Sequence, residues 1–159
     1  MTMKLGFALS SIGDNEIANN FINQANEFLT QRYDVDIIGF VNNQEKPKRY
    51  PTFGIMNINE MYDYDGAVIA LDQSTAQKLS ICPGPRKRFW YLWNLPWTPA
   101  KTVFSFEKTF AWFHQRNMIL IAKDDIYKGL LNQTWGTNIQ HIVSDFNIHQ
   151  FLEVIRDVK

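Results

Sequence analysis

Residues 4–41, KLGFALSSIGDNEIANNFINQANEFLTQRYDVDIIGFV, decide the fold of this chain. Residues 4–10 are a short apolar run that ends in small residues, which is typical of a buried parallel strand. The apolar residues that follow recur at steps of three and four, which predicts a helix with one buried face: Ile17, Ala18, Phe21, Ile22, Ala25, Phe28 and Leu29. Asp14 is the expected N-cap of this helix. Residues 35–41 form a second strand, so the segment predicts a right-handed βαβ unit.

The alternation of strands and helices continues to the last residue. We expect further strands at residues 52–56, 66–71, 88–93, 118–122 and 139–143. We expect further helices at residues 72–81, 101–115, 124–135 and 147–158, and a helical turn at residues 58–62. Asp72 or Ser74 would cap the helix at residues 72–81, and Gly136 would end the helix at residues 124–135. The pattern predicts one α/β domain over residues 1–159, with an open, doubly wound, mostly parallel Rossmann-like sheet and helices on both faces.

Composition narrows the classes of function. The 159 residues carry no formal net charge and are 45% hydrophobic, so a globular domain is expected and nucleic acid is an improbable partner. Cys82 is the only cysteine and the three histidines are scattered, so we expect no disulfide, no metal and no cofactor. The chain shows neither a signal-peptide pattern nor a run of 18 apolar residues, so we expect a cytoplasmic protein without a membrane span.

The fold class nominates ligand-binding positions. In open α/β sheets, ligands bind beyond the carboxyl ends of the strands, near the point where the strand order reverses. The loops expected there supply the candidate substrate-binding residues Ser10, Ser11, Gly13, Ser74, Trp93, Asn94, Trp97, Lys123 and Asp124. The first loop lacks the G-x-G-x-x-G spacing of a dinucleotide site, and no P-loop is present. A plain turn and helix cap is the favoured interpretation of residues 10–15, and a ligand loop is the alternative.

Residues 86–97, RKRFWYLWNLPW, are the most distinctive stretch. Alternation along a strand sends Phe89, Tyr91 and Trp93 to one face and Trp90 and Leu92 to the other, so most of these rings are expected in the core. The rings at the strand end, Trp93 and Trp97, remain available to a ligand. Carbohydrate contact is the second interpretation of this stretch, and nucleic-acid binding is the third.

Residues 66–97 also resemble the N-terminal half of GT-B glycosyltransferases, in particular bacterial and phage members. The resemblance is carried by the GAVIAL strand, the Asp72-Gln73-Ser74 turn, the helix after it and the RFWYLWNLPW strand. It implies an acceptor-side half that binds a carbohydrate or nucleotide-sugar, with a separate donor-binding subunit or a homo-oligomer completing the enzyme. If the chain is catalytic, Asp14 or Asp72 is the expected general base, since inverting transfer needs a carboxylate or histidine near the acceptor hydroxyl.

Three alternatives stay open. The first is a non-enzymatic binding or assembly module that uses Trp97 and Trp112 as contact surface. The second is nucleic-acid binding through residues 46–49 and 86–88. The third rests on residues 64–72, YDGAVIALD, which resemble the strand that opens the site of nucleoside deoxyribosyltransferases. That chemistry needs a carboxylate nucleophile on the next helix, and residues 74–78, STAQK, supply none.

Overall fold

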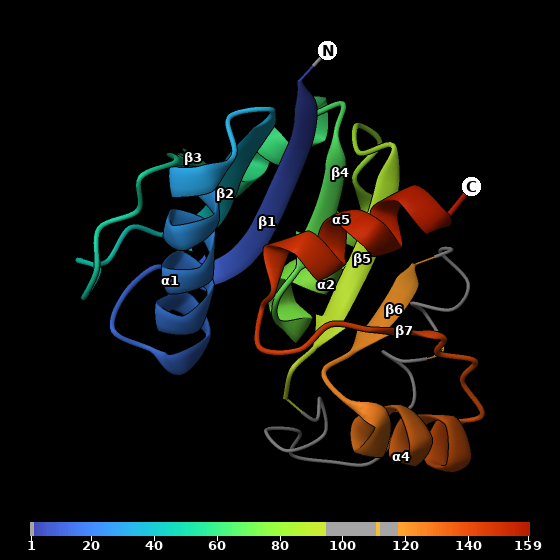
Figure 1. Ribbon diagram of the computed structural model, residues 1–159. Coiled ribbons are helices and arrows are strands. Elements are labelled where there is room, and N and C mark those ends of the chain that lie inside the picture. Colours follow the sequence, from blue (N-terminus) through green and yellow to red (C-terminus); the bar gives the residue numbers. More distant parts are fainter. Residues whose placement is uncertain (1, 95–110, 112–117) are drawn as a thin grey trace.

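The computed structural model describes residues 2–94, 111 and 118–159, and these residues form one parallel sheet with helices on both sides (Figure 1). The strands are β1 (Met3–Ser11), β2 (Val35–Asn43), β3 (Gly54–Asn57), β4 (Ala67–Ala70), β5 (Lys87–Leu92), β6 (Ile119–Ala122) and β7 (His141–Ile142). The helices are α1 (Glu16–Gln31), the 3-10 helix η1 (Ile58–Asp63), α2 (Gln73–Ile81), α4 (Asp125–Trp135) and α5 (Ile148–Asp157).

The strand order is β3-β2-β1-β4-β5-β6-β7, and each neighbouring pair is parallel. The chain winds outward from β1 through β2 to β3 and then returns to β4, on the other side of β1. The direction of winding therefore reverses between β1 and β4, which makes this pair the topological switch point. This order confirms the predicted doubly wound α/β fold, and the sheet is parallel throughout the described residues.

The two faces of the sheet carry separate hydrophobic cores. The core on one face is closed by α1 and α5, and the core on the other face by η1, α2 and α4 (Figure 1). Alternation along β5 sends Phe89 and Tyr91 into the first core and Trp90 and Leu92 into the second, as predicted. Trp93 packs against the first core and is half-buried. Most rings of this strand therefore serve packing.

Aromatic side chains connect the sheet to both helices in the core under α1 and α5. The ring of Phe7 on β1 lies 4.5 Å from Phe21 of α1 and 5.5 Å from Phe151 of α5, measured between centroids. Tyr91 lies 5.0 Å from Phe151, and its buried hydroxyl donates a hydrogen bond of 2.7 Å to the Val143 carbonyl. These contacts fix both helices against the centre of the sheet, and burial raises the pKa of Tyr91 well above its usual range.

The N-cap of α1 is Asn15, so the prediction of Asp14 was wrong. The Asn15 side chain accepts a hydrogen bond of 2.9 Å from the Ala18 amide. The helix begins one residue later than expected, and the exposed Asp14 carboxylate accepts instead from the Asn19 side chain (2.8 Å). Asp72 caps α2, one of the two residues expected to do so, and Gly136 ends α4 in the left-handed conformation as predicted.

The last strand is shorter than expected. The prediction covered residues 139–143, whereas β7 contains only His141 and Ile142. At its start, the backbone is bonded to the side chain of Asn132, which accepts from the Ile139 amide (2.9 Å) and donates to the Ile139 carbonyl (3.2 Å). A side chain thereby takes the backbone groups that a longer strand would have paired with β6. The helix expected at residues 101–115 lies, apart from Ala111, outside the described residues.

Candidate functional site

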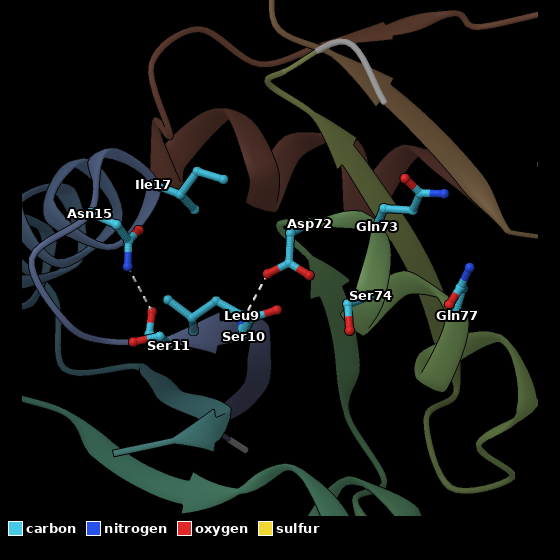
Figure 2. Close-up of a pocket in the computed structure, with 9 residues that line it drawn as sticks. All are labelled: Leu9, Ser10, Ser11, Asn15, Ile17, Asp72, Gln73, Ser74 and Gln77. Carbon is cyan, nitrogen blue, oxygen red and sulfur yellow. Dashed lines mark hydrogen bonds between the residues drawn. The ribbon is translucent and has the colours of Figure 1, made fainter. Parts of the chain in front are cut away.

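A cleft of about 480 Å³ opens at the switch point, between the carboxyl ends of β1 and β4 (Figure 2). We call it the switch-point cleft. It is lined by Leu9, Ser10, Ser11, Asn15, Ile17, Asp72, Gln73, Ser74 and Gln77. These residues come from the end of β1, the start of α1, the turn after β4 and the first turns of α2. The cleft lies where the fold class predicts ligand binding.

The Asp72 carboxylate joins the two sides of this cleft. Its Oδ2 accepts a hydrogen bond of 2.7 Å from the Ser10 amide at the end of β1, a bond drawn in Figure 2. Its Oδ1 accepts one of 2.9 Å from the Thr75 amide in the first turn of α2. The buried Thr75 hydroxyl in turn donates to the Ala8 carbonyl of β1 (3.0 Å). Both oxygens of Asp72 therefore bind backbone amides, and the side chain fixes α2 against β1.

The loop between β1 and α1 forms the other wall. The Gly13 amide donates to the Ser11 hydroxyl (3.0 Å), and the Asn15 side chain donates to the Ser11 carbonyl (3.3 Å). Gly13 is buried, and a Cβ atom there would lie 2.3 Å from a carboxylate oxygen of Glu45. The loop after β2 thus packs directly on this wall. A larger residue at Gly13 would have to displace the exposed side chain of Glu45.

Most residues that line the cleft have uncharged polar side chains, although most of the surface that they expose to it is apolar. Hydroxyl and amide side chains surround an apolar part made by Leu9 and Ile17, and Asp72 is the single charged residue among those that line it. Lysine and arginine are missing from this set, and the nearby Lys78 donates instead to the Asn42 side chain (2.6 Å). Such a lining can exchange hydrogen bonds with hydroxyl groups, but it offers no cation to a phosphate.

The structure brings together only some of the predicted site residues. Four of them line the cleft, namely Ser10, Ser11, Asp72 and Ser74, and Gly13 supports it through Ser11. Asp14 is exposed and does not line the cleft. The prediction omitted five lining residues: Leu9, Asn15, Ile17, Gln73 and Gln77. The last two, four residues apart, lie on the same side of α2, a spacing that could have identified them beside Ser74.

A second group of predicted residues lies at the ends of β5 and β6. The ammonium of Lys123 lies 5.5 Å from the ring centroid of Trp93 and 4.1 Å from that of Tyr127. Asp124 accepts from the Tyr127 amide (2.8 Å) as the N-cap of α4, and Asn94 is exposed. None of these residues lines the switch-point cleft. The single site that we expected is therefore divided into two groups among the described residues.

Two predicted contact residues, Trp97 and Trp112, lie outside the described residues, as does His114. The assembly hypothesis that depends on the two tryptophans stays a prediction. In the described part of the chain, no cluster of three or more histidine, cysteine or acidic side chains is placed to hold a metal ion. Cys82 is buried, and burial raises the pKa of its thiol, which disfavours the reactive thiolate.

The basic residues 86–88 are largely committed to the fold. Lys87 donates to the carbonyls of Ile155 (2.8 Å) and Val158 at the end of α5. Arg88 donates two hydrogen bonds, of 2.6 and 3.1 Å, to the Cys82 carbonyl. Only Arg86 of the three is exposed. This arrangement removes two of the cations on which the nucleic-acid hypothesis depends.

Comparisons of the chain with protein-family models, with curated proteins and with solved structures give no significant match. Across the helices that the structure describes, none has the length and apolar character needed to cross a bilayer.

Proposed function

We propose that this chain binds a neutral, hydroxyl-bearing small molecule of the carbohydrate class in the switch-point cleft, as the acceptor-side half of a GT-B glycosyltransferase would. One observation carries the proposal. At the switch point of a Rossmann-like sheet, where ligands of this fold class bind, a cleft is lined by hydroxyl and amide side chains over an apolar part.

The chemistry of the lining supports a sugar over a phosphate. Serine hydroxyls and the amides of asparagine and glutamine both donate and accept, which matches the hydroxyl groups around a sugar ring. The C–H faces of the ring would lie against Leu9 and Ile17. A phosphate would meet no lysine or arginine in this lining, and it would lie near the carboxylate of Asp72.

Sugar transfer would require a group that removes a proton from the acceptor hydroxyl. Asp72 is the carboxylate in the cleft, but both of its oxygens accept from backbone amides. Asp14 is exposed outside the cleft. We propose that this chain contributes acceptor binding, and that a separate donor-binding subunit or a second copy of the chain completes the transferase. The catalytic roles of Asp14 and Asp72 stay predictions.

A titration followed by ¹⁵N NMR tests the proposal. Neutral saccharides such as glucose, galactose and N-acetylglucosamine, and then uridine diphosphate glucose, would be added to the full chain. We expect saturable shifts at the amides of Ser10, Ser11, Gln73 and Ser74, with the neutral sugars sufficient to produce them.

A pair of variants locates the response. Ser74→Trp places a large ring in the cleft from an exposed position of α2, and Ser144→Trp places the same ring in the exposed loop after β7. Ser74→Trp should abolish the shifts and Ser144→Trp should preserve them. The proposal would be wrong if no saccharide shifts these amides, or if both variants lose the response equally.

A further inference from the structure

A second cleft lies at the opposite edge of the sheet, where β1, β4 and β5 begin. We call it the basal cleft. Its volume is also about 480 Å³. It is lined by Thr2, Met3, Lys4, Asp65, Gly66, Ala67, Arg86, Lys87, Ile155 and Arg156. The last two residues belong to α5, so the C-terminal helix closes one side of this cleft.

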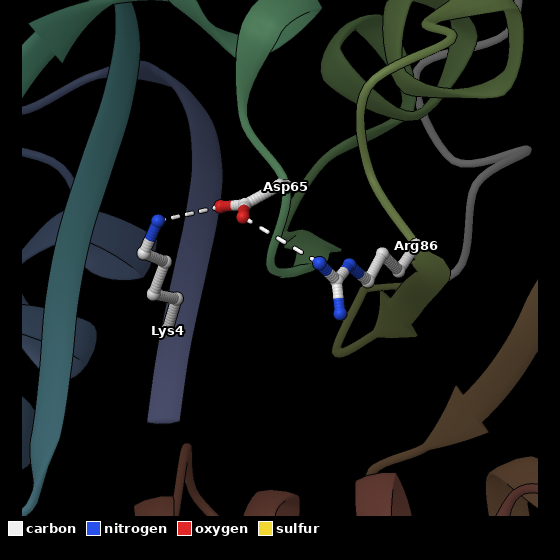
Figure 3. Close-up of polar contacts among 3 residues, drawn as sticks. All are labelled: Lys4, Asp65 and Arg86. Atoms are coloured by element: carbon white, nitrogen blue, oxygen red, sulfur yellow. Dashed lines mark hydrogen bonds and ion pairs between the residues drawn. The ribbon is translucent and has the colours of Figure 1, made fainter. Parts of the chain in front are cut away.

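Positive charge dominates this lining, with four basic residues against one acidic residue. Lys87 neutralises the end of α5, because its ammonium donates to the carbonyls of Ile155 and Val158. Lys4 and Arg86 remain at the opening and approach Asp65 from two sides (Figure 3). Lys4 Nζ lies 2.7 Å from Oδ1 of Asp65, and an Arg86 guanidinium nitrogen lies 3.6 Å from Oδ2.

The contact of Arg86 leaves its guanidinium accessible. The side chain is 71% exposed, and its separation of 3.6 Å from Asp65 is longer than a hydrogen bond to a carboxylate. The guanidinium can therefore present its planar pair of N–H donors to another anion. The Asp65 carboxylate is 53% exposed and lies between these two cations. The anionic group of a ligand would be attracted to the same position and would compete with this carboxylate.

The floor of the basal cleft is apolar and close-packed. Ala67 and Ile155 are almost fully buried, and Met3 packs against the same core. A Cβ atom on Gly66 would lie 2.6 Å from the Lys4 carbonyl, so no side chain can project from that position without displacing the backbone of β1. An apolar surface thus lies beside a cationic opening, an arrangement that suits a ligand with one anionic and one apolar end.

From this arrangement we infer that the basal cleft binds a small organic anion, with its phosphate or carboxylate against Arg86 and Lys4 and its apolar part against Met3, Ala67 and Ile155. The switch-point cleft plays no part in this inference, because it lies at the other ends of the strands and has a different lining. Each cleft can bind its ligand whether or not the other cleft binds one.

The test compares three probes on the full chain by ¹⁵N NMR at neutral pH and low salt: phenyl phosphate, inorganic phosphate and phenol. Phenyl phosphate should produce saturable shifts at the amides of Gly66, Ala67 and Lys87, with a higher affinity than inorganic phosphate. Phenol should bind more weakly than phenyl phosphate, because it lacks the anion. Equal affinity for the two phosphates would overturn the role of the apolar floor.

Two variants and their matched controls locate the anion. Arg86→Gln should weaken phenyl phosphate binding about tenfold, whereas Arg49→Gln, at an exposed arginine that does not line the cleft, should leave it unchanged. Asp65→Asn should strengthen binding, because the competing carboxylate is removed. Asp63→Asn deletes the same charge from a nearby exposed residue outside the lining and should have little effect.

The inference is overturned if phenyl phosphate shifts none of the three amides, or if the two arginine variants weaken binding equally. An equal gain from the two asparagine variants would also overturn it, because the response would then reflect net charge alone. A failure of sugars to bind the switch-point cleft leaves these readouts unaffected, since they report residues at the other edge of the sheet.

Discussion

The two clefts have the same volume and share β1 and β4, but their linings differ in charge. The cleft beyond the carboxyl ends of the strands offers hydroxyl and amide groups, and the cleft at the amino ends offers cations. Because the strands are parallel, their carboxyl ends lie together on one side of the sheet and their amino ends on the other, and each side holds one of the clefts. The residues at the strand ends then decide what class of ligand each opening can hold.

Two aspartates show the difference most clearly. Asp72 follows β4, is half-buried and accepts hydrogen bonds from two backbone amides. Asp65 precedes β4, is exposed and contacts the side chains of Lys4 and Arg86. The first carboxylate is part of the fold, because backbone groups depend on it. The second can be displaced, since its partners are exposed side chains that water or another anion can satisfy.

The largest expected effect is a difference between the two aspartates in their contribution to the free energy of unfolding. Asp72→Ala removes the N-cap of α2 and leaves the Ser10 amide without its acceptor, so we expect the free energy of unfolding to fall by about 2–4 kcal/mol. Asp65→Ala should change it by no more than the error of the measurement. Urea denaturation followed by circular dichroism gives both values. Asp72→Asn, which keeps one acceptor oxygen, should fall between them. The comparison fails if the two alanine variants lose equal stability.

The next effect is a difference between two lysines of the basal cleft in their contribution to the free energy of unfolding. Lys87→Met removes the donor to two carbonyls at the end of α5, and we expect a loss of about 1–2 kcal/mol in unfolding free energy. Lys4→Met should have a much smaller effect, because Lys4 is half-exposed and pairs with an exposed carboxylate. The same urea titration measures both. Equal losses would show that Lys87 is no more structural than Lys4.

Salt should distinguish the ligands of the two clefts. Raising sodium chloride from about 0.02 M to about 0.3 M shortens the range of electrostatic attraction, so phenyl phosphate binding at the basal cleft should weaken roughly threefold. Sugar binding at the switch-point cleft should stay constant, since its lining offers hydrogen bonds and no cation. The NMR titrations, repeated at both salt concentrations, measure each affinity. A salt-independent phenyl phosphate affinity would contradict the role of Arg86 and Lys4.

The smallest effect concerns the titration of Asp65. The hydrogen bond from Lys4, together with the charges of Lys4 and Arg86, holds the pKa of this carboxyl below its usual range. Because the pKa is lowered in the folded state, the stabilising contribution is present above the unfolded pKa of about 3.9. It is lost as the pH falls through the folded pKa. In Lys4→Met the pKa should rise toward its ordinary value, whereas in Lys48→Met it should not. Carbon-detected NMR of the carboxyl group follows both titrations.

The fold could be predicted because its signals are local. The periodic apolar residues of α1 and the buried runs of β1, β2 and β4 follow directly from side-chain spacing, and alternation in β5 assigned its rings to the correct faces. The errors arose where a side chain competed for backbone groups. Asn132 binds the backbone before the last strand, and Asn15, in place of Asp14, caps α1. Sequence spacing carries little information about which of several polar residues makes such a bond.

The site was only partly predictable. The rule for strand ends identified Ser10, Ser11, Asp72 and Ser74, but it could not show that the ends of β5 and β6 form a group apart from them. The basal cleft was not expected, because the same rule directs attention to the opposite edge of the sheet. Its cations, Lys4 and Arg86, are far apart in the sequence and become neighbours only through the pairing of β1 and β5 with β4.

The hydrogen bond from Ser10 to Asp72 spans 62 positions of the chain, with β2 and β3 made in between. A contact of such long range costs loop-closure entropy, because two distant segments must be brought together before it stabilises the fold. The switch-point cleft consequently exists only where α2 has docked against β1. A molecule that occupies it would bind the folded domain in preference to the unfolded chain, so it would raise the free energy of unfolding by mass action.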